Sequence, residues 1–68
     1  MITLQVNGKQ VELAGATPLL DYLRQLGVDP RAVAVERNGE IVERARFDTV
    51  VLDEGDQVEI VRMVGGGR

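Results

Sequence analysis

Two stretches of alternating apolar and polar residues, 2–6 and 9–13, flank an Asn7-Gly8 pair near the start of the chain. Alternation with a period of two is typical of a β-strand with one buried face. An Asn-Gly pair favours the positive φ angles of a two-residue hairpin turn. The sequence therefore predicts a β-hairpin, and its buried face is expected to consist of Ile2, Leu4, Val6, Val11 and Leu13.

A short, leucine-rich helix is predicted after the hairpin. Thr17 and Pro18 are suited to the N-cap and the first helical position, and Gly27 is suited to the end of the helix. Tyr22 is expected to flank the apolar face of this helix, which should consist of Leu19, Leu20, Leu23 and Leu26. A helix of fewer than three turns needs to pack on a sheet to be stable.

Further strands are predicted in the second half of the chain. In the last of them, Val58 and Ile60 should point inward, while Val61 and Met63 lie on the opposite face of the pleat. The predicted segments are a strand at 32–37, a turn at Asn38-Gly39, a short strand at 40–42, a loop or one helical turn at 43–48, a brief apolar segment at 49–52, a turn at 53–56 and the last strand at 57–64.

The order of these elements predicts the fold class. A hairpin, a helix packed across it and more strands form an α+β arrangement of two layers. We expect a mixed sheet of four or five strands over residues 1–64, followed by a flexible glycine-rich tail at 65–68. The helix should cover one face of the sheet and leave the other to solvent or to a partner.

The composition limits the chemistry that the chain can do alone. It has 68 residues, a formal net charge of −3, and no His, Cys or Ser. The usual general base, nucleophiles and commonest metal ligands are therefore missing, and we expect a protein that is not itself an enzyme and binds no metal or cofactor. The negative charge argues against nucleic acid as a partner. No apolar run approaches a membrane span, so we expect a cytoplasmic protein.

The densest group of carboxylates is Asp53, Glu54, Asp56 and Glu59. A calcium loop requires a longer segment with a full set of oxygen ligands. These residues are therefore interpreted as a solvated turn before the last strand.

The chain ends in Val64, Gly65, Gly66, Gly67 and Arg68. Glycine has no side chain to pack, so this stretch is not expected in the core. One interpretation is a frayed end or an expression remnant. The other is a thin arm that brings a carboxylate into another protein's active site, where side chains would block the approach. The absence of side-chain chemistry elsewhere favours the arm.

The residues just before the glycines allow two interpretations. Val61, Met63 and Val64 could form an exposed apolar patch on which a partner docks. Alternatively, they could pack under a loop or against the 43–52 segment. The sequence leaves both alternatives open.

Several segments together resemble the ThiS family of sulfur carriers, over essentially the full chain. They are Val35-Glu36-Arg37-Asn38, Glu40-Ile41, Asp56, Val58-Glu59-Ile60-Val61, and Met63-Val64 leading into Gly65-Gly66-Gly67. The resemblance implies a ubiquitin-like β-grasp fold. It also implies a partner adenylating enzyme that uses ATP to activate the carboxylate of Gly67, with Gly65 and Gly66 recognised beside it. Sulfur from a cysteine desulfurase would then give a thiocarboxylate, the sulfur donor that thiazole synthase uses to form the thiazole ring of thiamine.

Arg68 departs from the family pattern, in which the reactive glycine is usually the last residue. We expect Arg68 to be removed; an added residue or an inactive copy are the alternatives. Two other functions remain open at this stage. One is a sister carrier for molybdopterin, tRNA thiolation or cysteine synthesis, or a protein modifier, on the same fold. The other is a β-grasp interaction module with an inert tail.

Overall fold

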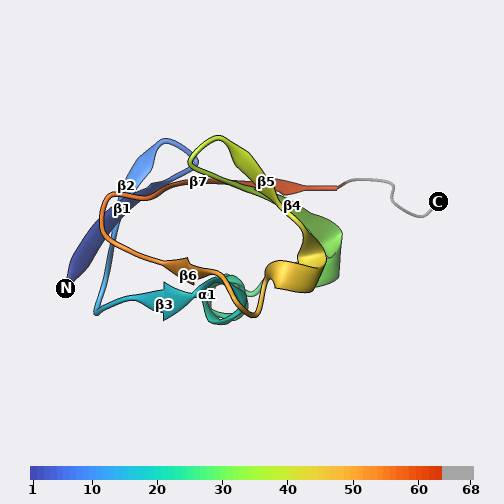
Figure 1. The fold of residues 1–68 in the computed structure, drawn as a ribbon, viewed down its shortest axis with the longest axis horizontal. Helices are drawn as coiled ribbons and strands as arrows, with labels where there is room; N and C mark the ends of the chain where they lie inside the picture. Colours follow the sequence, from blue (N-terminus) through green and yellow to red (C-terminus); the bar gives the residue numbers. More distant parts are fainter. Residues whose placement is uncertain (64–68) are drawn as a thin grey trace.

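The computed structural model describes residues 1–63 and begins with the predicted hairpin (Figure 1). β1 (Ile2–Val6) pairs antiparallel with β2 (Lys9–Leu13). In the turn between them, Asn7 and Gly8 have φ angles of 52° and 80°. An Asn-Gly pair adopts positive φ at low steric cost, so the local sequence sets both the turn and the register of the hairpin.

The remaining long strands complete a five-stranded sheet in the order β2-β1-β7-β4-β5. β7 (Gln57–Arg62) lies at its centre, parallel to β1 and antiparallel to β4 (Val33–Arg37). β4 pairs antiparallel with β5 (Glu40–Val42) across the predicted turn at Asn38, where φ is 54°. The predicted α+β class and mixed sheet are therefore confirmed.

The start of the helix differs from the prediction. Thr17 is not an N-cap: β3 (Thr17–Pro18) pairs with β6 (Val51–Leu52), and α1 (Leu19–Leu26) begins after Pro18. The N-cap residue is Pro18, which offers no side-chain acceptor. Backbone carbonyls replace that acceptor, because Leu19 N–H donates to Val50 O at 2.8 Å and Leu20 N–H donates to Phe47 O at 3.2 Å. These bonds satisfy amides that a helix leaves free at its first turn.

The face that α1 buries also differs in part. Leu19 and Leu23 are fully buried, as predicted, but Tyr22 is only 5% exposed and Leu26 is 46% exposed. Residues 19, 22 and 23 are spaced i, i+3 and i+4, so they share the face that packs on the sheet. Leu26 lies in the last turn, next to the C-cap Gly27, where the side chain is no longer covered. Tyr22 is therefore a core residue rather than a flanking one, and the prediction that Leu26 belongs to the apolar face is wrong.

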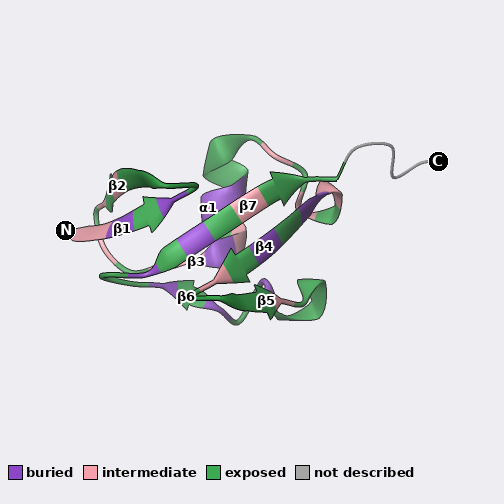
Figure 2. Cartoon of the chain, turned by 90° about the horizontal axis from the view of Figure 1, so that it is seen from above, coloured by how far each residue is buried: buried purple, intermediate pink, exposed green. Residues whose placement is uncertain are grey.

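The core lies between the sheet and the layer formed by α1, β3 and β6 (Figures 1 and 2). Two 3-10 turns, η1 (Pro30–Ala32) and η2 (Arg44–Arg46), connect the layers. The buried side chains are Leu4, Val6, Leu19, Tyr22, Leu23, Val33, Val35, Phe47, Val50, Leu52 and Val58. No helix within residues 1–63 is long and apolar enough to cross a membrane.

Candidate functional site

The central strand β7 leads the chain toward its C-terminal glycines. Arg62 pairs with Val33, and the N–H of Met63 donates to Ala32 O at 2.9 Å. β7 also has neighbours on both sides, β1 and β4. The last described residues, Arg62 and Met63, are therefore held on the sheet by backbone contacts with β4 and Ala32.

The tail itself lies outside the described residues. This applies to Val64, to Gly65, Gly66 and Gly67, and to Arg68. The roles expected for these residues, and the domain boundary after residue 64, therefore remain predictions.

The sheet face opposite α1 carries no helix within residues 1–63 and faces the viewer in Figure 2. Val61 on this face is 57% exposed, and Met63, which follows β7, is 45% exposed. The alternative in which these two side chains pack under a loop or against the 43–52 segment is therefore wrong. Their role in docking a partner remains a prediction.

Another exposed apolar residue of this face was not predicted from the sequence. Ile41 on β5 is 74% exposed and lies on the same face as Val61. A groove of about 330 Å³ runs between them, lined by Ala34, Val35, Glu36, Ile41, Glu59 and Val61. The alternation after the Asn38-Gly39 turn placed Ile41 opposite Glu36, an outward position, so the signal was present in the strand pattern.

The carboxylate group at residues 53–59 is not a uniform solvated turn. Asp56 is 7% exposed, so the interpretation is wrong for this residue. Its Oδ2 accepts from Arg37 Nε at 3.0 Å and from Asp53 N–H at 2.8 Å, and its Oδ1 accepts from Asn38 Nδ2 at 3.1 Å. Arg37 and Asn38 are 19 and 18 residues away from Asp56, so these two donors could not be predicted from the local sequence. They give Asp56 a structural function.

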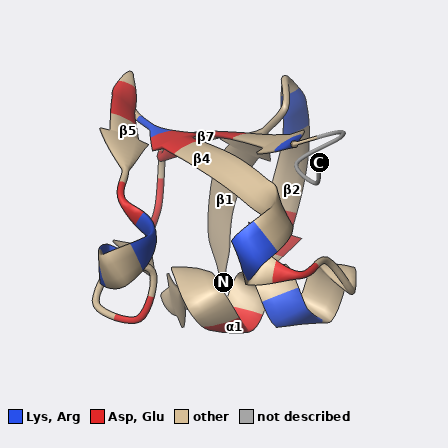
Figure 3. Cartoon of the chain, turned by 90° about the vertical axis from the view of Figure 1, so that its right-hand side faces the viewer, with Lys and Arg blue, Asp and Glu red and all other residues tan. Residues whose placement is uncertain are grey.

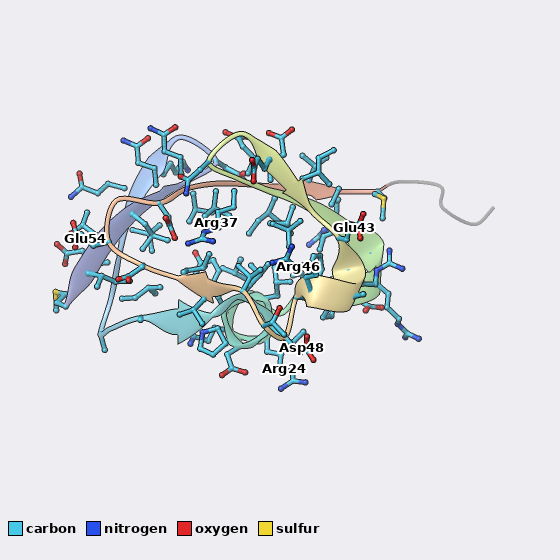
Figure 4. The ribbon with its side chains drawn as sticks, in the orientation of Figure 1. Arg24, Arg37, Glu43, Arg46, Asp48 and Glu54 are labelled. Atoms are coloured by element: carbon cyan, nitrogen blue, oxygen red, sulfur yellow. The ribbon has the colours of Figure 1, made fainter. Side chains whose placement is uncertain are left out.

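Burial raises the pKa of Asp56, but the hydrogen bonds from Asn38, the Asp53 backbone and Arg37, with the charge of Arg37, outweigh it and hold the pKa below its usual range. Arg37 points from the sheet toward the layer that contains β6 (Figure 4). Asp56 therefore remains charged at neutral pH and links β4 to the loop before β7.

The other acidic residues of this group make different contacts from Asp56. Glu54 accepts from Thr3 N–H at 3.0 Å, and Asp53 accepts from Glu54 N–H at 2.7 Å. Glu59 lies on the outer face of the sheet. Within residues 1–63, no three acidic side chains converge as a metal site would require.

The ThiS family model matches residues 4–67, which is nearly the whole chain and includes all three tail glycines. The chain belongs to the ThiS family. The match begins within β1 and covers all later strands, the helix and the glycines, but not Arg68.

Two members of the ThiS family match along almost their full lengths. The sulfur carrier protein ThiS of Bacillus subtilis is 42% identical over 65 residues, which cover 94% of this chain and 98% of that protein. The crystal structure of the thiamine biosynthesis protein ThiS from Geobacter metallireducens has a TM-score of 0.84 at 38% identity, covering 97% of this chain and 100% of that one. The latter confirms the predicted β-grasp fold.

A longer relative contains a segment similar to this chain. The thiazole synthase of Paramagnetospirillum magneticum is 42% identical over 64 residues, which cover 94% of this chain but 20% of that protein. A second thiazole synthase, from Magnetococcus marinus, gives the same proportion. This chain therefore spans about a fifth of the length of these two relatives.

Proposed function

We propose that this chain is a sulfur carrier of thiamine biosynthesis and that the carboxylate of Gly67 is the group that receives and releases the sulfur. The observation that supports this most is the match with the sulfur carrier protein ThiS of Bacillus subtilis, which extends over 94% of this chain and 98% of that protein. In this function the chain is a protein substrate of partner enzymes, and none of its side chains needs to be catalytic.

The proposed chemistry begins at the tail. A carboxylate oxygen of Gly67 attacks the α-phosphorus of ATP, bound by the adenylating enzyme, and pyrophosphate leaves. A persulfide, supplied by a cysteine desulfurase, attacks the acyl carbon and displaces AMP. A thiol then attacks the resulting S–S bond, forms a disulfide and leaves the thiocarboxylate on Gly67. Thiazole synthase takes its sulfur from this group.

The residue types in the tail suit this chemistry. Gly65 and Gly66 have no side chains, so a narrow channel can bind their backbone closely on both sides. The body would supply recognition through its outer sheet face, with Val61, Met63 and Val64 as docking residues. This division leaves all covalent chemistry to the tail and to the partners.

Arg68 follows Gly67 in the sequence, so the carboxylate of Gly67 is part of a peptide bond until Arg68 is removed. A peptide carbonyl cannot be adenylated in the manner of a carboxylate. We therefore propose that a peptidase removes Arg68 before activation, and that the reactions take place in the cytoplasm, where ATP is available.

The test compares three forms of the chain, which extend through Gly66, Gly67 or Arg68. Each is incubated with the adenylating enzyme of the same genome, ATP, a persulfide donor and a thiol, and its intact mass is measured. We expect only the form that ends at Gly67 to exchange one oxygen for sulfur. A thiocarboxylate on the form that retains Arg68 would contradict the precursor step, and no thiocarboxylate on any form would contradict the carrier function.

Rescue of a thiamine auxotroph separates this pathway from those of related sulfur carriers. Loss of rescue on deletion of residues 66–68 is expected for a carrier. An interaction module would retain its function without them.

A further inference from the structure

The strand register brings two glutamates face to face on the outer side of the sheet. Glu36 on β4 lies directly opposite Glu59 on β7, and its other neighbour is Ile41 on β5. One step along the strands, Ala34 lies opposite Val61. These five residues all line the groove of about 330 Å³ on the outer face.

Among the described residues, no salt bridge compensates the charges of Glu36 and Glu59. Side chains directly opposite each other in an antiparallel pair lie about 5 Å apart at Cβ, and like charges there destabilise the sheet.

The rest of the outer face does not compensate this repulsion. By strand alternation, the outward positions of the five strands include three acids and no Lys or Arg. Acidic residues are also seen on β4 and β7 in Figure 3. The outward residues are Thr3, Gln5, Gln10, Glu12, Ala34, Glu36, Ile41, Gln57, Glu59 and Val61.

The apolar neighbours of the glutamates define the partner further. Ile41 and Val61 are 74% and 57% exposed, on either side of the groove. A surface that complements the groove presents an apolar side chain together with a Lys or Arg, because a cation relieves the repulsion between the two carboxylates. A nucleic acid or another acidic surface would be repelled.

We propose that this groove is a docking site for thiazole synthase, which inserts a Lys or Arg side chain between Glu36 and Glu59 and packs an apolar side chain on Ile41 and Val61. The inference rests on the proposed function and names the contact for the sulfur-donating step. The two thiazole synthase relatives contain a segment similar to this chain within one longer polypeptide, which supports this choice of partner.

The test uses the full chain and the thiazole synthase of the same genome. The variant E36Q/E59Q removes the repulsion and the site for the cation, so two opposite effects are expected. The Tm of the free chain should rise by about 2–5 °C, and the Kd measured by calorimetry at low salt should weaken about tenfold or more. The dependence of Kd on salt should also decrease, because fewer charges meet in the complex.

The variant E12Q/D48N is the matched control. It removes the same number of charges, but Glu12 lies on β2, two strands away from β7 and three from β4, and Asp48 lies on the helix side of the molecule (Figure 4). Its Kd should stay within about twofold of the original value. The variant E59K should stabilise the free chain through a cross-strand ion pair with Glu36 and should abolish binding.

Equal Kd values for E36Q/E59Q and the control would overturn the proposed docking site, as would an unchanged Tm for the first variant. The intact-mass assay keeps this result separate from the proposed function. If the form that ends at Gly67 receives sulfur but does not bind thiazole synthase, the docking site alone is overturned. If that form receives no sulfur, the carrier function is overturned, whatever the value of Kd.

Discussion

Asp56 joins the loop before β7 to the end of β4, and its replacement by alanine is expected to destabilise the whole fold. Three donors from two parts of the chain meet at this carboxylate: Arg37 Nε and Asn38 Nδ2 at the end of β4, and the N–H of Asp53 in the same loop. The same loop is held to β1, because Gly55 N–H donates to Thr3 O at 2.8 Å. Loss of the carboxylate therefore affects both neighbours of the central strand.

The magnitude follows from the three hydrogen bonds. Each is worth about 1 kcal/mol net, and bonds to a charged group are worth about 1.5–3 kcal/mol. The Arg37 side chain is 34% exposed, so solvent screening reduces its share. We expect a total of about 3 kcal/mol for Asp56→Ala. For a domain with a free energy of unfolding near the low end of 5–15 kcal/mol, this is a large fraction. It corresponds to a decrease of roughly 12–24 °C in Tm.

Urea unfolding followed by circular dichroism measures this effect, provided that the m-value is unchanged between variants. Asp56→Asn retains the volume of the side chain, so a substantial loss in this variant assigns the effect to lost charge and acceptors rather than to a cavity. The exposed Asp48 gives the control, because Asp48→Ala should change stability by less than about 0.5 kcal/mol. If Asp56→Ala costs no more than Asp48→Ala, the argument from the hydrogen bonds is wrong.

Three further predictions concern the stability of the same fold. The pKa of Asp56 in the folded protein lies below its unfolded value of about 3.9. The contribution of Asp56 to stability is therefore fully present above the unfolded pKa and is lost as the pH falls through the folded pKa. Urea unfolding from pH 7 down to pH 3 should show this loss of stability, and Asp56→Asn should reduce the loss. Leu23→Ala should lower the free energy of unfolding by about 2–5 kcal/mol because Leu23 is fully buried, whereas Leu26→Ala should lower it by under about 1 kcal/mol. Equal losses in urea unfolding would contradict the observed helix orientation. Asn7→Gly keeps the positive φ of the turn but removes the side-chain hydrogen bonds to Ile60 N–H and O, at 2.8 and 3.2 Å. This variant should lose about 1–2 kcal/mol of stability, measured by thermal unfolding. An unchanged Tm would show that these bonds add nothing to the β1–β7 pairing.

The parts of the fold that depend on neighbouring residues could be predicted from the sequence. The turns at Asn7-Gly8 and Asn38-Gly39 were identified because Asn-Gly has a local conformational preference. The C-cap at Gly27 was predicted for the same kind of reason, and its φ angle is 76°. The inward positions of Val58 and Ile60 followed from alternation.

The predictions that were wrong concern features that depend on contacts between distant residues. Thr17 has the chemistry of an N-cap, but pairing with Leu52 places it in a strand. Tyr22 packs in the core because the sheet lies above it. Periodicity alone could not decide which of the neighbouring helix positions would face the sheet. Asp56 was interpreted as solvated because its partner Arg37 is 19 residues away in the sequence.

The candidate site could be predicted only in part, because it also depends on contacts between distant residues. Val61 and Met63 were identified from the alternation along one strand. Ile41 was missed because its nearness to Val61 depends on the order β7-β4-β5, which no local pattern fixes. Strand order therefore decides which outward residues form one surface.

The outer face differs from a sheet face that needs only to be soluble. Such a face is served by polar residues of mixed charge, which avoid both exposed apolar side chains and facing like charges. Here Ile41 and Val61 are exposed, and Glu36 faces Glu59 between them. Both features lower the stability or solubility of the free chain, and both occur in one groove beside the strand that leads to the glycines. A partner that supplies a cation and an apolar side chain removes both costs at once, so the stability lost in the free chain becomes affinity in the complex.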